Sequence, residues 1–201
     1  MNLKNYYWYF EKALSTEFCD KIIKLGKSLQ RKKALTGTAN KYTKEVQKIR
    51  KSNVAWLNEQ WIYKEIQPFI QTANINAGWN FQWDFSESCQ FTEYKKNQFY
   101  DWHCDSWDST YNDPKNLNVH NKIRKLSVTC SLSNPEEYKG GELEFDFRNN
   151  PDGKPNIVKC KEIIPRGSIV VFPSHVWHRV APVTKGTRYS LVIWNLGNSF
   201  I

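Results

Sequence analysis

The chain has 201 residues, of which 40% are hydrophobic and 15% aromatic, and its formal net charge at pH 7 is +9. This length suits one domain with a real core, and no apolar run is long enough to span a membrane. Residues 1–8 lack the apolar stretch of a signal peptide, so we expect a cytoplasmic protein without a membrane partner.

The first third of the sequence reads as helical. Ser15 or Thr16 can cap a helix whose apolar residues recur at helical spacing, and a second helix is predicted from 56 to 74, with Pro68 inside it. Between them, residues 32–52 are polar and have few apolar anchors, which predicts a mobile loop.

The positive charge is concentrated in residues 21–51, which hold eleven Lys or Arg and one acid, a local balance of +10. This basic window suits contact with an acidic partner or a phosphate backbone. Because no aromatic–basic interleaving accompanies it, a solvated helix and loop is the simpler interpretation. The window precedes the β-rich region, so we expect it to lie outside any metal pocket.

From about residue 80 the hydrophobic period changes from that of a helix to that of a strand. Trp79, Phe81, Trp83 and Phe85 alternate with polar residues, and turn residues separate further apolar runs. We predict strands at 89–95, 98–104, 124–133, 141–147, 157–163, 168–173, 177–181 and 187–195. The expected fold class is α+β, mainly β: a jelly roll (double-stranded β-helix) with the N-terminal helices packed on one sheet. We expect a single domain over 1–201, with a helical support region at 1–78 and a jelly-roll core at 79–197.

A metal site is indicated by the triplet His103-Cys104-Asp105. In an extended chain, residues i and i+2 point to the same face, so His103 and Asp105 can bind one ion while Cys104 turns away. A third ligand is needed, and His178, in an apolar strand, is the best candidate. His175 is expected on the opposite strand face and His120 in a polar loop. Two imidazoles and one carboxylate leave three coordination positions open, the arrangement of non-haem iron(II) oxygenases.

A cosubstrate site is indicated by Arg188, which stands ten residues after His178 in a β-branched and aromatic strand. A buried arginine needs an anion, and its planar fork pairs with a carboxylate such as that of 2-oxoglutarate. Ser190 and Trp194 share its strand parity and are expected to face inward with it.

A hydroxylic stripe follows from Ser127, Thr129 and Ser131, which alternate with apolar residues. Such a strand face inside a β-rich core is unusual unless it meets a polar ligand. Thr129 is therefore the preferred additional cosubstrate contact.

The chain resembles the prolyl 4-hydroxylase-like branch of the 2-oxoglutarate oxygenases, and within it the small PKHD-type microbial and phage members. The resemblance covers roughly residues 10–197. Residues 94–105 are similar to the family pattern YxxGxxYxxHxD, with Asn97 at the glycine position, and Gly140-Gly141-Glu142, residues 167–174 and residues 178–183 match later motifs. Asn tolerates a left-handed backbone, so we expect the turn at Asn97 to survive.

The resemblance implies that His103, Asp105 and His178 bind Fe(II) and that Arg188 and Tyr94 contact 2-oxoglutarate. It also implies O2 as oxidant, ascorbate as a further cofactor, and hydroxylation of a C–H bond with release of succinate and CO2. A protein or peptide substrate, with peptidyl proline as the leading target, is expected on the same ground. The residues do not predict an oligomeric state.

Three alternatives remain beside this interpretation. Demethylation or other modification of nucleic acid would suit the basic window, but that branch carries a second arginine where this chain has Trp194. Halogenases lose the carboxylate ligand, which is present here as Asp105. A non-catalytic nucleic-acid-binding jelly roll would not need the triad or Arg188. The loop at 106–121, directly after Asp105, fits a lid as well as it fits a plain connection.

Overall fold

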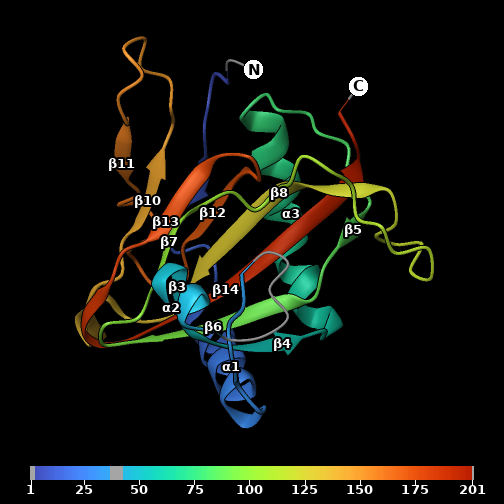
Figure 1. Cartoon of the computed structure of the whole chain (residues 1–201). Coiled ribbons are helices and arrows are strands. Elements are labelled where there is room, and N and C mark those ends of the chain that lie inside the picture. Colours follow the sequence, from blue (N-terminus) through green and yellow to red (C-terminus); the bar gives the residue numbers. More distant parts are fainter. Residues whose placement is uncertain (1–2, 37–42, 201) are drawn as a thin grey trace.

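The computed structural model describes residues 3–36 and 43–200 as two antiparallel sheets with helices against one of them (Figure 1). The helical elements are α1 (Thr16–Ser28), α2 (Lys44–Ile49), α3 (Gln60–Asn76) and the 3₁₀ turn η1 (Pro135–Glu137). The strands are β1 (Trp8–Phe10), β2 (Lys32–Lys33), β3 (Arg50–Lys51), β4 (Asn53–Leu57), β5 (Phe85–Ser86), β6 (Cys89–Lys95), β7 (Phe99–His103), β8 (Lys122–Ser131), β9 (Tyr138–Gly140), β10 (Leu143–Asp146), β11 (Ile157–Lys159), β12 (Ile169–Pro173), β13 (Trp177–Val180) and β14 (Val183–Asn198).

The larger sheet has the strand order β1-β12-β8-β14-β6-β4-β2, and β5 and β9 also pair with β14. The smaller sheet has the order β11-β10-β13-β7-β3. Most neighbouring strands, such as β12 and β8 or β13 and β7, are far apart in the sequence, because the chain crosses repeatedly between the two sheets. This is the winding expected of a jelly roll.

The main core lies between the helices and the outer face of the larger sheet. Alternate residues in the central parts of β4, β6, β8, β12 and β14 are apolar and fully buried there, for example Phe91, Val128 and Leu191. Ile22 of α1 and Ile66 of α3 pack against this face. The prediction of N-terminal helices on one sheet is therefore confirmed, and Ser15 caps α1 by accepting a hydrogen bond from the Phe18 amide.

The inner face of the larger sheet, which is turned toward the smaller sheet, is unusually polar. Ser127, Thr129 and Ser131 of β8 are buried on it, and Thr92 of β6 and Ser190 of β14 lie on the same face. Apolar contacts close part of the space between the sheets through a second cluster at residues 143–176. The candidate site lies in the rest of the space between the sheets, where the walls are polar.

Two predictions in the first third of the chain are wrong in detail. Residues 32–52 were expected to form one loop, but they include β2, α2 and β3, and Thr43 caps α2 by accepting from the Val46 amide. The predicted loop also included Thr36 and residues 37–42, and residues 37–42 lie outside the described part of the chain. The second helix starts at Gln60 rather than 56, because residues 53–57 form β4 and pair with β6.

The predicted strand at 79–85 is also wrong, because only Phe85 and Ser86 pair there. Asn80 has a φ of +52°, and the Asn74 side chain accepts from the Phe81 amide and donates to the Phe81 carbonyl. These bonds turn the chain, while the alternating aromatic rings still pack on the main core. The later predicted strands are present with shifted ends, and β11 is limited to three residues. Within the described ranges, none of the helices has the length and apolarity needed to cross a membrane.

Candidate metal and cosubstrate site

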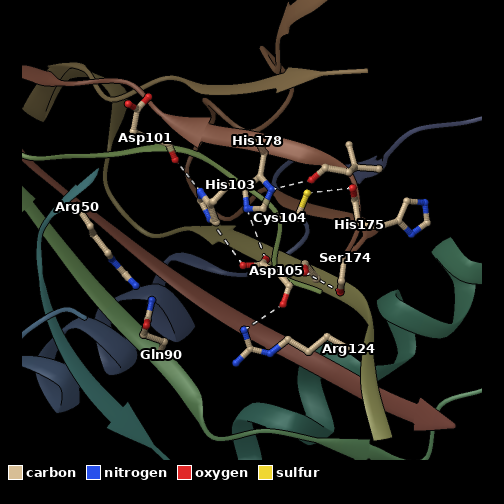
Figure 2. A network of polar contacts seen from close by, with 12 residues as sticks. Arg50, Gln90, Asp101, His103, Cys104, Asp105, Arg124, Ser174, His175 and His178 are labelled. Carbon is tan, nitrogen blue, oxygen red and sulfur yellow. Dashed lines mark hydrogen bonds and ion pairs between the residues drawn. The ribbon is translucent and has the colours of Figure 1, made fainter. Parts of the chain in front are cut away.

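Three potential metal ligands meet between the sheets. His103 is the last residue of β7, Asp105 comes two residues later, and His178 belongs to β13. His103 and His178 are directly opposite each other in the β7–β13 register, and Asp105 follows β7 by two residues. His103 Nε2 lies 3.7 Å from one Asp105 carboxylate oxygen, and His178 Nε2 lies 3.5 Å from the other. All three ligand atoms lie within 4.8 Å of one another. Figure 2 shows the three side chains converging on one point.

The backbone fixes the orientation of both imidazoles. His103 Nδ1 lies 2.7 Å from the Asp101 carbonyl oxygen, and His178 Nδ1 lies 3.0 Å from the Val176 carbonyl oxygen. A carbonyl only accepts, so each Nδ1 carries the proton and each Nε2 lone pair is left toward Asp105. The Asp105 backbone is held by a hydrogen bond from its amide to the Ser174 carbonyl, at 2.9 Å.

The protonation states also suit a cation. Burial, followed by the proximity of His178, lowers the pKa of His103 to about 3, so its imidazole is neutral near pH 7. Burial alone would raise the pKa of the Asp105 carboxyl, but His178, His103 and Arg124 outweigh it and lower that pKa to about 2. Two imidazole nitrogens and one carboxylate are the donor set that iron(II) takes in 2-His-1-carboxylate sites. The residues therefore fit the metal that the sequence predicts.

Arg188 is buried in β14, with 3% of its surface exposed. Its Nη1 donates to Ser190 Oγ at 3.4 Å, and its guanidinium carbon lies 5.7 Å from the centre of the Tyr94 ring. Across the described ranges, no Asp or Glu lies within ion-pair distance of it. A buried guanidinium without a carboxylate is costly, which indicates that a ligand supplies the anion.

The other predicted cosubstrate contacts lie around Arg188. Tyr94 is its register partner on β6, and Ser190 is two residues further along β14 on the same face. Thr129 is on the neighbouring strand β8, opposite Val192, whereas Ser131 is directly opposite Ser190. The register therefore places Ser131 nearer to Arg188 than Thr129, which the sequence alone could not distinguish.

A cavity of about 460 Å³ opens beside the metal ligands. His103, Asp105, Trp107, Arg124 and Trp194 contribute to its wall from the jelly-roll core. Seven residues of the basic window also line it: Lys32, Lys33, Ala34, Leu35, Thr36, Ile49 and Arg50. The expectation that the basic window stays outside the metal pocket is therefore wrong, because β3 pairs with β7 and carries the window to the cavity.

The two remaining histidines lie away from the ligand cluster. His175 is exposed in the turn before β13, and its ring contacts Phe200 with centroids 6.3 Å apart. His120 lies in the turn before β8. The Cys104 side chain turns away from the ligands and donates from Sγ to the His175 carbonyl at 3.3 Å.

Arg124 and Glu87 form a supporting pair that sequence reasoning missed. The Arg124 guanidinium donates to both Glu87 carboxylate oxygens, at 2.8 and 2.6 Å, and its Nη1 lies 3.5 Å from the Asp105 carbonyl oxygen. The same carboxylate accepts from the Tyr111 hydroxyl at 2.9 Å, which ties the 106–121 loop to the site. The available signal for Arg124 was a charged residue within a segment whose later part alternates as a buried strand.

Comparison with known proteins agrees with this geometry. Residues 89–195, more than half of the chain, match the model of the 2OG-Fe(II) oxygenase superfamily, and the chain belongs to that superfamily. A PKHD-type hydroxylase of Hyphomonas neptunium is 43% identical over 70 residues, which are 34% of this chain and 27% of that protein. The PKHD-type hydroxylase YbiX of Escherichia coli is 34% identical over 104 residues, 52% of this chain and 40% of that protein. The matched segments thus span well under half of these relatives.

Solved structures resemble nearly the whole chain. The viral collagen prolyl hydroxylase of Paramecium Bursaria Chlorella virus-1, in its 2OG complex, has a TM-score of 0.65 and 21% identity, covering 96% of this chain and 97% of that one. A prolyl hydroxylase from Trichoplax adhaerens, in complex with a peptide fragment of the hypoxia inducible factor oxygen degradation domain, has a TM-score of 0.69 and 19% identity, covering 96% and 84%. At these identities the likeness establishes the fold, and the predicted jelly roll is confirmed.

Proposed function

We propose that this chain is an Fe(II)- and 2-oxoglutarate-dependent dioxygenase that hydroxylates a C–H bond of a peptide, with peptidyl proline as the leading target. The observation that carries the proposal is the combination of a 2-His-1-carboxylate cluster with a buried arginine that has no acidic partner in the described ranges. The products of the cosubstrate are succinate and CO2. The whole chain, 1–201, acts as one domain in this proposal, and ascorbate sustains its activity.

In this proposal, residues on or next to the smaller sheet bind the metal, and residues on the larger sheet bind the cosubstrate. His103, Asp105 and His178 hold Fe(II), which supplies the Lewis acidity and the O2 chemistry of the reaction. Arg188 receives the distal carboxylate of 2-oxoglutarate, while Tyr94, Ser190 and Thr129 contribute a polar wall. This chain fixes the cosubstrate before reaction and excludes water from the space between the sheets.

A peptide substrate is supported by the surroundings of the cavity. Two half-exposed indoles, Trp56 at 48% and Trp107 at 40%, line it, and such rings pack well on proline and on extended peptide. The Trichoplax adhaerens enzyme, which shares the fold, is in complex with a peptide.

Nucleic acid is the second candidate, since Lys32, Lys33 and Arg50 line the cavity. Two further cations of the basic window lie on another surface. Lys27 lies over the Tyr189 ring at 4.6 Å, and Arg31 binds Glu93 at 2.7 Å, both on the helix-covered side of the larger sheet. Lys27 and Arg31 therefore do not join Lys32, Lys33 and Arg50 in one track for a phosphate backbone, which favours the peptide.

The test is succinate formation from 2-oxoglutarate with and without Fe(II), followed by mass spectrometry of proline-rich peptides and single-stranded oligonucleotides after incubation with both and ascorbate. A mass increase of one oxygen on a peptide, with weak dependence on salt, supports the proposal. Modified oligonucleotide and untouched peptide, with affinity falling steeply with salt, would favour nucleic acid. Absence of iron-dependent succinate in a folded protein would reject an oxygenase.

A further inference from the structure

Arg50 on β3 is a second buried arginine without a carboxylate partner. Only 5% of it is exposed. Its Nε donates to Ser52 Oγ at 3.1 Å and its Nη1 donates to the Leu35 carbonyl at 3.2 Å, and both of these acceptors are neutral. Within residues 3–36 and 43–200, no Asp or Glu reaches it as an ion pair. Its charge is therefore held in the protein without compensation, unlike that of Arg124, which has Glu87.

The position of Arg50 relates it to the reaction centre. The Arg50 guanidinium lies 4.3 Å from the centre of the Tyr100 ring, and the Tyr100 ring stacks on the His103 ring with centroids 3.5 Å apart. Arg50 is thus separated from a metal ligand by one aromatic ring. It lines the same cavity as His103 and Asp105, and Figure 2 shows its guanidinium facing the Gln90 amide beside the ligand cluster.

A donor of another residue in the same cavity wall lacks an acceptor. Trp194 Nε1 is buried and has no hydrogen-bond partner in the described part of the chain. Among the described residues that line this cavity, Asp105 has the one carboxylate, and the two histidines lie within 3.7 Å of it. The wall therefore offers a buried cation and a free N–H group, but no negative charge apart from the metal ligand.

We propose that Arg50 binds a carboxylate of the substrate, so that the substrate is a peptide with an acidic residue next to the residue that is oxidised. The planar guanidinium pairs with a carboxylate through two hydrogen bonds, and it packs on the Tyr100 ring, which in turn stacks on the His103 ring. A single buried fork selects one acidic side chain, whereas a nucleic acid backbone requires a row of cations, and the larger sheet separates Lys27 and Arg31 from this cavity.

This inference rests on the proposed function, because it assigns the substrate of the same site. Arg188 binds a carboxylate of the cosubstrate, and Arg50 binds a carboxylate of the substrate. Loss of Arg50 should therefore weaken binding of the peptide and leave the apparent KM for 2-oxoglutarate unchanged.

The probes are two short synthetic alanine peptides with one central proline, flanked by aspartate in one and by asparagine in the other. Isothermal titration calorimetry on the metal-free protein measures their binding without turnover. We expect the aspartate peptide to bind at least about tenfold tighter, as one charge-assisted hydrogen-bond pair provides. The substitution Arg50→Gln should abolish the difference, and Arg50→Lys should retain part of it.

Lys51→Gln is the matched control, since it removes the same charge from the next residue of β3, where Lys51 lies near the Phe99 ring, 5.9 Å away. It should keep the full preference for aspartate. A melting curve shows whether Arg50→Gln folds. If it does not fold, the affinities of the two peptides for the unmodified protein and for Arg50→Lys still test the assignment.

Equal binding of the two peptides by the unmodified protein, or a preference for aspartate that survives Arg50→Gln, would overturn the assignment. So would a thymidine oligonucleotide that binds through Arg50 more tightly than the aspartate peptide. Succinate formation by the unmodified protein without any peptide is measured in parallel. Its absence would reject the oxygenase function, while the calorimetry judges Arg50 on its own.

Discussion

Replacing Arg188 by methionine separates the part of this residue in ligand binding from any part in folding. Methionine retains most of the length and none of the charge. Among the described residues, the guanidinium has only Ser190 Oγ at 3.4 Å and the ring of Tyr94 as partners. Because an unpaired buried charge opposes folding, the ligand-free variant should melt at the same temperature as the unmodified protein or slightly higher.

The two proteins should differ in how much added 2-oxoglutarate raises their melting temperature. At one hundred times its Kd, a ligand raises the free energy of unfolding by about 2.7 kcal/mol, which is about 5–11 °C in Tm for a chain of this size. Loss of a buried charge-assisted pair costs on the order of 2–5 kcal/mol of binding, or at least about 30-fold in affinity. The stabilisation of the variant at the same concentration should then fall below about 1 kcal/mol.

The assay is thermal unfolding with Mn(II) in place of iron, with and without 2-oxoglutarate. Arg179→Met is the matched control, because Arg179 binds the Glu144 carboxylate at 2.6 Å on the neighbouring strand. This control should melt lower without ligand and keep the full shift on adding 2-oxoglutarate. If Arg188→Met showed that same pattern, Arg188 would be a structural residue and the cosubstrate assignment would be refuted.

Three further predictions follow from the site. Alanine in place of any one of the three candidate iron ligands should abolish succinate formation, whereas His175→Ala should keep most of it; loss of iron binding in a folded His175→Ala protein would contradict the ligand assignment. Gly141→Ala should raise the KM for 2-oxoglutarate, because Gly141 has a φ of +71° and a Cβ there would lie 3.0 Å from Arg188 Cδ; an unchanged KM would show that the arginine adapts. Glu87→Gln should lower the free energy of unfolding by about 3–5 kcal/mol, measured by urea denaturation, because it leaves Arg124 buried without its acid; a change below about 1 kcal/mol would mean that water compensates the charge.

The parts of the fold that the sequence predicts are those with a long, regular pattern. β6, β8 and β14 alternate over seven or more residues, and α1 carries a capping serine at the expected place. The left-handed turn at Asn97 is confirmed, with a φ of +64°. The ligand cluster was predictable for the same reason, since a two-residue spacing on an extended chain fixes which side chains share a face.

The parts that were missed depend on partners far away in the sequence. β2 and β3 have two residues each, too few to show any period, and they exist because β4 and β7 supply their hydrogen bonds. In β4, Trp56 continued the spacing of the following helix, although in the structure its backbone pairs with Gln90. Arg50 was hidden among the other cations of the basic window, and only the β3–β7 register places it in the cavity.

The central position of β14 has a consequence for how the chain is made. This strand lies between β8 and β6 and also pairs with β5 and β9, yet residues 183–198 leave the ribosome after all of these partners. Until then, β8 and β6 are open edges that present unpaired amides and carbonyls to other chains. Closing so many distant pairings in one step is slow, and the waiting edges are prone to aggregate. We therefore expect nascent chains that stop before residue 183 to depend on chaperones, and the complete chain to fold in a late, cooperative step.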